Sequence, residues 1–118
     1  MENKDIEKYI NQGTLYDFYG KLLTQHQQRI YEDVVFNDLS LSEIAENEGI
    51  SRQGVSDLIK RCNKALVSYE EKLGLIRKFD ETKSYVKEIQ KIVKIYQDTK
   101  DEGLVAKIDE LSSKILDV

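Results

Sequence analysis

The chain has 118 residues, and its 18 Lys and Arg against 22 Asp and Glu give a formal net charge of −4. Hydrophobic residues make up 40% of the sequence, which is too much for a disordered chain and enough for a small core. Proline is absent and there are six glycines, so few residues interrupt helices and we expect a mostly helical protein.

Several kinds of site and location are excluded at the outset. No run approaches the roughly 18 apolar residues of a membrane span, and the first residues lack the apolar stretch of a secretory signal. Cys62 is the one cysteine and His26 the one histidine, so neither an intrachain disulfide nor a Cys/His zinc site can form. We therefore expect a cytoplasmic protein with no membrane partner, no metal and no cofactor.

The predicted elements begin after a polar segment, residues 1–13, that we expect to be flexible. Apolar residues then recur on one helical face, at Leu15, Phe18, Tyr19, Leu22 and Leu23. Thr24 and Gln27 have the spacing of a capping box, which predicts a helix from about Gln25 to Phe36. Asn37 and Asp38 then indicate a turn.

Two further helices follow in close succession. Ser40 and Glu43 form a second capping-box pattern, which predicts a helix over about residues 41–47 that ends at Gly49. Ser51 can cap the next helix, which continues to about Leu73 and ends at Gly74.

The last third of the chain has a heptad pattern, which predicts a helix over 80–101, an interruption at Gly103 and a shorter helix after it. The residues with a and d spacing are Phe79, Val86, Ile89, Val93 and Tyr96. Such stripes need a partner surface, and three remain open: these helices fold back on the domain or on each other, form a homodimer, or dock onto another protein.

The most informative segment is residues 41–60, LSEIAENEGISRQGVSDLIK. A helix-turn-helix needs a small residue where its helices cross, a glycine in the turn, and apolar residues that lock the second helix against the first. The chain meets these demands in order with Ala45, Gly49, Ile50, Val55 and Leu58. The sequence therefore predicts an all-α bundle that contains a helix-turn-helix over residues 14–73, followed by a helical extension over 75–118.

Residues 22–66 resemble region four of bacterial sigma factors, a helix-turn-helix of the winged-helix-like class without a wing. More closely, residues 15–73 resemble the YlxM family of Gram-positive bacteria, through LYDFYGKLLT (15–24), DLSLSEIAENEGISRQGV (38–55) and YEEKL (69–73). The resemblance implies a helix-turn-helix regulator. It also implies a link to the signal recognition particle (SRP) pathway, because the family's genes adjoin those of the particle's GTPase and its receptor.

In a DNA-bound helix-turn-helix, the first residues of the second helix face the major groove and later cations meet phosphates. The candidate contacts to DNA or structured RNA are therefore Ser51, Arg52, Gln53, Ser56, Lys60, Arg61 and Lys64. Residues 14–69 carry six basic and eight acidic residues, so binding by one copy should be weak and a homodimer would double the contacts. Asp57 precedes Arg61 by four residues, and the two could instead pair with each other.

No set of side chains makes an active site, since no nucleophile has a base and the carboxylates are scattered over helix faces. We therefore predict a protein that is not an enzyme. The leading hypothesis is a DNA-binding regulator in or beside the SRP pathway. The alternative is a protein-interaction module that keeps the helix-turn-helix scaffold and tunes the SRP GTPase without reading DNA.

Overall fold

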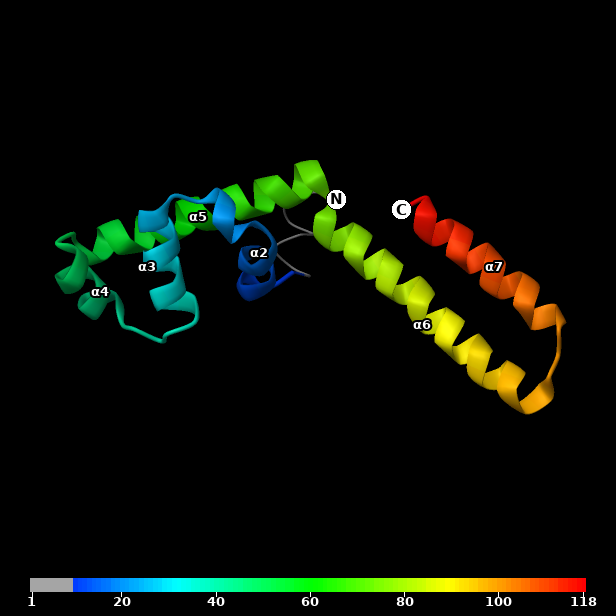
Figure 1. The fold of residues 1–118 in the computed structure, drawn as a ribbon. Coiled ribbons are helices and arrows are strands. Elements are labelled where there is room, and N and C mark those ends of the chain that lie inside the picture. The colour runs from blue at the N-terminus through cyan, green and yellow to red at the C-terminus, as the bar shows by residue number, and fades with distance from the viewer. Residues whose placement is uncertain (1–9) are drawn as a thin grey trace. The chain divides into compact units, whose positions relative to one another are not determined.

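The computed structural model describes residues 10–118, and every regular element in that range is helical. The elements are α2 (Gln12–Tyr19), the 3-10 turn η1 (Gly20–Leu22), α3 (Gln25–Val35), α4 (Leu41–Glu48), α5 (Arg52–Leu73), α6 (Leu75–Thr99) and α7 (Gly103–Leu116) (Figure 1). The predicted all-α class is therefore confirmed. By internal packing the chain divides into two units, one that ends at Gly74 and one that begins at Leu75.

The first helix differs from its prediction at both ends. It begins at Gln12, because the Asn11 side chain accepts a hydrogen bond from the Thr14 N–H at 2.8 Å and so caps the helix. It ends at Tyr19, where the chain tightens into the 3-10 turn before an extended Leu23. The single helical face expected over Leu15–Leu23 is therefore wrong beyond Tyr19. The flexible segment predicted for residues 1–13 lies mostly outside the described residues.

The next three helices begin where the sequence indicates and end within one residue of the predicted positions. Thr24 and Ser40 each accept a hydrogen bond from the backbone three residues later, and both capping boxes are complete. Helices α4 and α5 end at Gly49 and Gly74, which have left-handed φ angles of 68° and 62°. Only glycine adopts this conformation without strain from a Cβ atom, which explains both termini.

Helix α5 is the 22-residue element against which α2, α3 and α4 pack. Its buried side chains meet those of α3 and α4 in one apolar cluster formed by Ile30, Ile44, Ala45 and Val55, flanked by Val34, Leu39, Leu58 and Ile59. Each helix contributes residues from one face, as their 3.6-residue spacing requires. This cluster fixes the orientation of α5 and hence the direction of its exposed face.

The second unit is a hairpin of two helices, α6 and α7, that pack on each other (Figure 1). The expected interruption at Gly103 is displaced, because Gly103 is the first residue of α7. The chain instead turns at Lys100, whose φ is 57° and whose N–H donates to the Tyr96 carbonyl at 2.7 Å. The Asp101 carboxylate then accepts a hydrogen bond from the Gly103 N–H at 3.0 Å and starts α7.

Candidate nucleic-acid interface

The turn between α4 and α5 is closed by the backbone. The Ala45 carbonyl accepts hydrogen bonds from the N–H groups of Gly49 and Ile50. Apart from its neighbours along the chain, no atom lies within 4 Å of a Cβ added at Gly49, so the glycine is needed for its φ angle and not for space. Ala45 is 8% exposed, which agrees with a small residue at the crossing of two helices.

The residues predicted to lock α5 divide into two groups. Val55 is fully buried and Leu58 packs at the edge of the same cluster. Ile50, expected to plug the turn, is 37% exposed and lies beside Gly54, 3.8 Å from where a Cβ would stand. Its side chain therefore covers the first turn of α5 and does not enter the core.

An ion-pair cluster, which we call the Glu48 clamp, ties α3 to the end of α4. The Glu48 carboxylate accepts hydrogen bonds from Arg29 Nε at 3.0 Å and Arg29 Nη2 at 2.5 Å. His26 Nε2 lies 3.3 Å from the same carboxylate. Because Glu48 directly precedes the turn, the clamp holds the helix-turn-helix at the point where the chain changes direction.

The clamp also explains an acidic residue in an unfavourable place. A carboxylate in the last turn of a helix faces the negative end of the helix dipole. Here the hydrogen bonds from the Arg29 guanidinium lower the pKa of Glu48 below its ordinary value and keep it ionised. The sequence does not indicate this pair, because Arg29 and Glu48 are 19 positions apart and lie on different helices.

The predicted contact residues lie at the start of α5 and on its outward side. Arg52, Ser56, Lys60 and Lys64 follow one another every four residues, so they form one ridge along the helix. Arg52, Lys60 and Lys64 are exposed, and Ser56 is half-buried. Arg61 is also exposed but points about 100° away from Lys60, outside this ridge.

Two candidates already have local hydrogen-bond partners. Ser51 Oγ accepts from the Gly54 N–H at 2.9 Å, so Ser51 is the N-cap of α5 as predicted. Gln53 Nε2 donates to Asp57 Oδ1 at 2.9 Å. The suggested pair between Asp57 and Arg61 is wrong for the described part of the chain, where Asp57 binds Gln53 and forms no ion pair with Arg61.

Two buried tyrosines form hydrogen bonds with side chains of α5. The Tyr31 hydroxyl donates to Asn63 Oδ1 at 2.7 Å, and the Tyr19 hydroxyl donates to Glu70 at 2.5 Å. Burial raises the pKa of Tyr31 and of the Cys62 thiol, and both groups stay protonated at neutral pH. These contacts hold α2 and α3 against the C-terminal half of α5.

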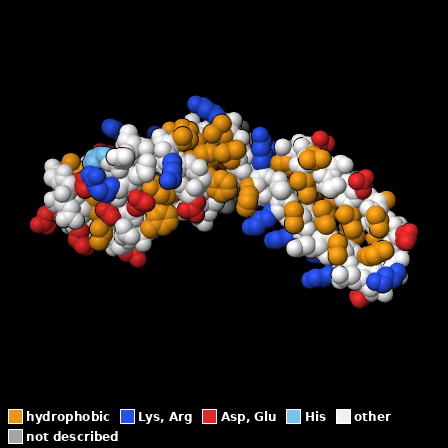
Figure 2. All heavy atoms as spheres, viewed as in Figure 1, with side chains coloured by type: hydrophobic (Ala, Val, Ile, Leu, Met, Phe, Trp, Pro, Cys, Tyr) orange, Lys and Arg blue, Asp and Glu red, His pale blue; other side chains and the backbone are white. Residues whose placement is uncertain are grey.

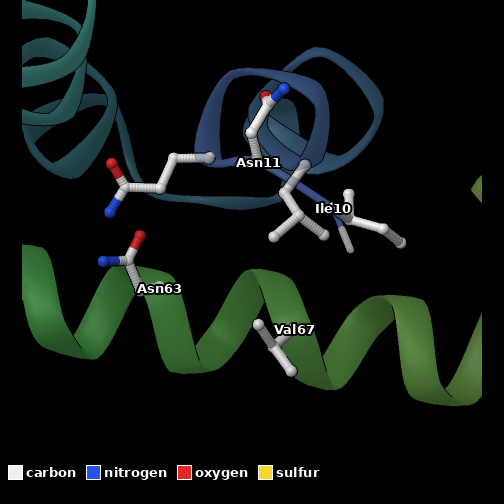
Figure 3. Close-up of a pocket in the computed structure, with 6 residues that line it drawn as sticks. Ile10, Asn11, Asn63 and Val67 are labelled. Atoms are coloured by element: carbon white, nitrogen blue, oxygen red, sulfur yellow. The ribbon is translucent and has the colours of Figure 1, made fainter. Parts of the chain in front are cut away.

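A pocket of about 400 Å³ lies between the start of α2 and the middle of α5 (Figure 3). Its six lining residues are Ile10, Asn11, Gln12, Leu15, Asn63 and Val67. None of them carries a charge or a nucleophile, so this pocket has no side chain for acid–base or covalent chemistry. Elsewhere in residues 10–118, no three His, Cys, Asp or Glu side chains group as metal ligands would. None of the helices in this range combines the length and apolar content needed to cross a membrane.

The closed turn, its left-handed glycine and the packing of α4 against α5 define a helix-turn-helix protein. The comparisons agree, since the UPF0122 family model, described as "Putative helix-turn-helix protein, YlxM / p13 like", matches residues 6–108. The chain belongs to this family.

Relatives of the same family match over most of their length. A UPF0122 protein of Thermoanaerobacter sp. strain X514 is 42% identical over 86% of this chain and 87% of its own. A UPF0122 protein of Geobacillus kaustophilus is 38% identical over 90% of this chain and 98% of its own. A UPF0122 protein of Caldanaerobacter subterraneus is 49% identical over 67% of this chain and 68% of its own.

Proposed function

We propose that this chain is a cytoplasmic regulatory protein that binds nucleic acid through the exposed ridge of α5 and catalyses no reaction. The observation that carries the proposal is the ridge itself, in which Arg52, Lys60 and Lys64 stand exposed at four- and eight-residue spacing on the second helix of a helix-turn-helix. Ser51, Gln53 and Ser56 lie at its start, where side chains of this motif meet base edges.

The charge count predicts weak binding by a single copy. Strong duplex binders often neutralise six to ten phosphates, whereas one α5 offers Arg52, Lys60, Arg61 and Lys64. Asp57 also stands beside Gln53 and repels phosphate. The proposal therefore includes a homodimer, because two copies double the cations without any change in the helix.

The YlxM resemblance adds the setting in which such a regulator would work. It implies a place in or beside the SRP pathway, and it supports either a nucleic-acid target or a protein component of the particle as partner.

A second candidate is a protein-interaction module that binds and tunes the SRP GTPase. The observation that favours it is the hydrogen bond between Gln53 and Asp57 at 2.9 Å, which engages the residue best suited to read an adenine edge. The net charge of −2 over residues 14–69 points the same way.

The test compares binding of duplex DNA and structured RNA at two salt concentrations. Arg52→Ala/Lys60→Ala should weaken binding at both and reduce its salt dependence, because two phosphate contacts are lost. Asp57→Asn should strengthen binding several-fold, because it removes a negative charge and keeps a side chain that accepts from Gln53.

The matched control is Lys72→Ala/Lys107→Ala, which removes the same charge from exposed residues that are not part of the ridge. Equal losses in both double variants would show non-specific attraction and contradict the role of the ridge. No binding at low salt by any form, together with recovery of the SRP GTPase in a pull-down with purified components, would favour the interaction module.

A further inference from the structure

Helix α6 carries two parallel stripes of apolar side chains. An inner stripe of half-buried residues lies on the side that packs on α7 and consists of Thr82, Tyr85, Ile89, Ile92 and Tyr96. An outer stripe contains Val86 and Val93, which are 41% and 37% exposed. The heptad residues of the sequence analysis are thus divided between the stripes, with Ile89 and Tyr96 inner and Phe79, Val86 and Val93 outer.

Helix α7 repeats the arrangement. Leu104, Ile108, Leu111 and Ile115 form its inner stripe, in which Leu111 is buried and the others are half-buried. Its outer stripe contains Val105, 51% exposed, and Leu116, 87% exposed. A helix that contacts one partner needs the narrow inner stripe alone, whereas a helix in a bundle carries this wider apolar face.

Both outer stripes turn toward the same face of the hairpin. In each helix the outer residue follows an inner one directly, as Val86 follows Tyr85 and Val105 follows Leu104. One residue corresponds to a rotation of about 100° around the helix axis. Seen from one end of the hairpin, this rotation is clockwise in one helix and anticlockwise in the other, because the helices are antiparallel. Since their inner stripes face each other, both outer stripes lie on the same face of the hairpin. Figure 2 shows this face, with apolar side chains gathered over the hairpin.

The two edges of this face differ in charge, since the outer edge of α6 is mainly basic and that of α7 is acidic. Lys87 and Lys94, both exposed, directly follow Val86 and Val93 and lie along the outer edge of α6. Glu102 and Asp109 are exposed and lie along the outer edge of α7. They are three and seven residues before Val105 and Leu116, so they lie close to the outer stripe of the same helix. Basic side chains follow one edge of the hairpin and acidic ones the other in Figure 2. Within the described residues, Lys87, Lys94 and Asp109 form no ion pair.

We propose that this face is a two-fold interface with a second copy of the chain, in which two hairpins form a four-helix bundle with α6 over the partner's α7. The two-fold axis runs parallel to the helices, so the basic edge of each copy faces the acidic edge of the other. The inference rests on the proposed function only in that this function calls for a homodimer.

The charge pattern selects this arrangement over the other face-to-face one. A two-fold axis across the helices would lay α6 on α6 and set basic edge against basic edge, and like charges at an interface are unfavourable. With the parallel axis every residue keeps its height. Asp101 lies in the turn between α6 and α7. Lys94 is seven residues before it and Asp109 is eight residues after it, so the two lie at nearly the same height along the hairpin. Lys94 is therefore level with Asp109 of the partner subunit.

The test is sedimentation velocity of the full chain over a concentration series without nucleic acid, so that its outcome is independent of whether α5 binds DNA. Lys94→Glu should weaken the dimer about tenfold or more, because each of two symmetric contacts changes from attraction to repulsion. Asp109→Lys should do the same. The combined Lys94→Glu/Asp109→Lys variant should restore association to within a few-fold of the parent, because the pair is then reversed and not lost.

Lys107→Glu is the control, since it makes the same charge change one residue before the inner Ile108 and hence on the opposite face. It should leave the dimer unchanged. Val86→Asp/Val93→Asp should give a monomer that keeps its helical circular dichroism. A parent chain that is monomeric at its highest soluble concentration, or a dimer that Lys94→Glu leaves intact or tightens, would overturn the proposal.

Discussion

Tyr16 is held between two other aromatic rings. Its ring stacks on Tyr31 with centroids 5.3 Å apart and planes at 14°, and Phe36 lies 5.6 Å away on a tilted plane. A Cβ added at Gly20 would stand 2.7 Å from two ring carbons of Tyr16. Because the neighbouring rings prevent Tyr16 from moving aside, Gly20 is required for the space it leaves.

Gly20→Ala should therefore lower the free energy of unfolding by about 1–3 kcal/mol, the usual cost of overpacking. Urea unfolding followed by circular dichroism would measure it. Gly54→Ala serves as the comparison, since the nearest atom to a Cβ there is the exposed Ser51 Oγ at 3.1 Å, and Ile50 lies at an ordinary contact distance of 3.8 Å. There the gain in helix propensity of about 1 kcal/mol should offset a small shift of the cap. Equal destabilisation by both substitutions would contradict the role assigned to the Tyr16 ring.

The same ring environment changes the titration of Tyr16. Burial, with the nearby Glu32 carboxylate as a smaller cause, raises the pKa of Tyr16 to about 12 from an ordinary value of 10.0. Since the folded-state pKa is raised, the stabilisation is complete below about pH 10 and is lost as the pH rises through 12. Tyrosinate absorbance should show late ionisation of both Tyr16 and Tyr31, and Tyr16→Phe should remove one of the two late-titrating groups. Complete ionisation of all tyrosines near pH 10 in the folded protein would be the contrary result.

At the scale of the helix pair, the Glu48 clamp makes the position of α4 depend on pH. The lowered pKa of Glu48 means that its stabilisation is complete above the ordinary carboxyl value of 4.5 and is lost as the pH falls through the folded-state value. The parent chain should therefore lose stability on acidification more steeply than Glu48→Gln, which keeps an acceptor for Arg29 and has no charge to lose.

The control for the clamp is Glu46→Gln, a change of the same kind at an exposed position of the same helix. Its acid unfolding should follow that of the parent, and salt should reduce the difference between the parent and Glu48→Gln because Arg29 is exposed. Identical acid profiles for all three chains would mean that the clamp adds nothing to stability.

Where local chemistry decides an element, the sequence was sufficient. The boxes at Thr24 and Ser40 and the glycines at 49 and 74 fix helix ends through bonds between near neighbours, and these ends are confirmed. Gly103 misled because a glycine can also start a helix, and the left-handed position went to Lys100 instead. The early end of α2 at Tyr19, where the chain tightens into the 3-10 turn, follows no capping pattern in the sequence.

The candidate site was predictable in its residue types and less so in its partners. Spacing along α5 was enough to expect an exposed Arg52 and Lys60. The spacing could not show that Gln53 donates a hydrogen bond to Asp57, because each of these exposed side chains can adopt several rotamers. The Glu48 clamp depends on how α3 crosses α4, and the division of the α6 heptads depends on where α7 packs. Both are tertiary facts.

Across the whole molecule, the ridge of α5 and the face of the hairpin make one joint prediction. Three ridge cations in a single copy would give a slope of log affinity against log salt of about −3, and two copies a slope of about −5, at roughly −0.9 for each phosphate contact. Arg52→Ala should reduce the dimer's slope by about two, since each copy loses one contact.

Val86→Asp/Val93→Asp should bring the slope on duplex DNA to the single-copy value while the ridge stays intact, because these residues lie on the hairpin and not on α5. Titrations at several salt concentrations measure both variants against the parent. A parent slope that matches one copy, and that the hairpin variant leaves unchanged, would mean that each chain binds alone. If Arg52→Ala reduces the parent slope and the hairpin variant does not, the ridge contacts DNA and dimerisation through the hairpin does not contribute to binding.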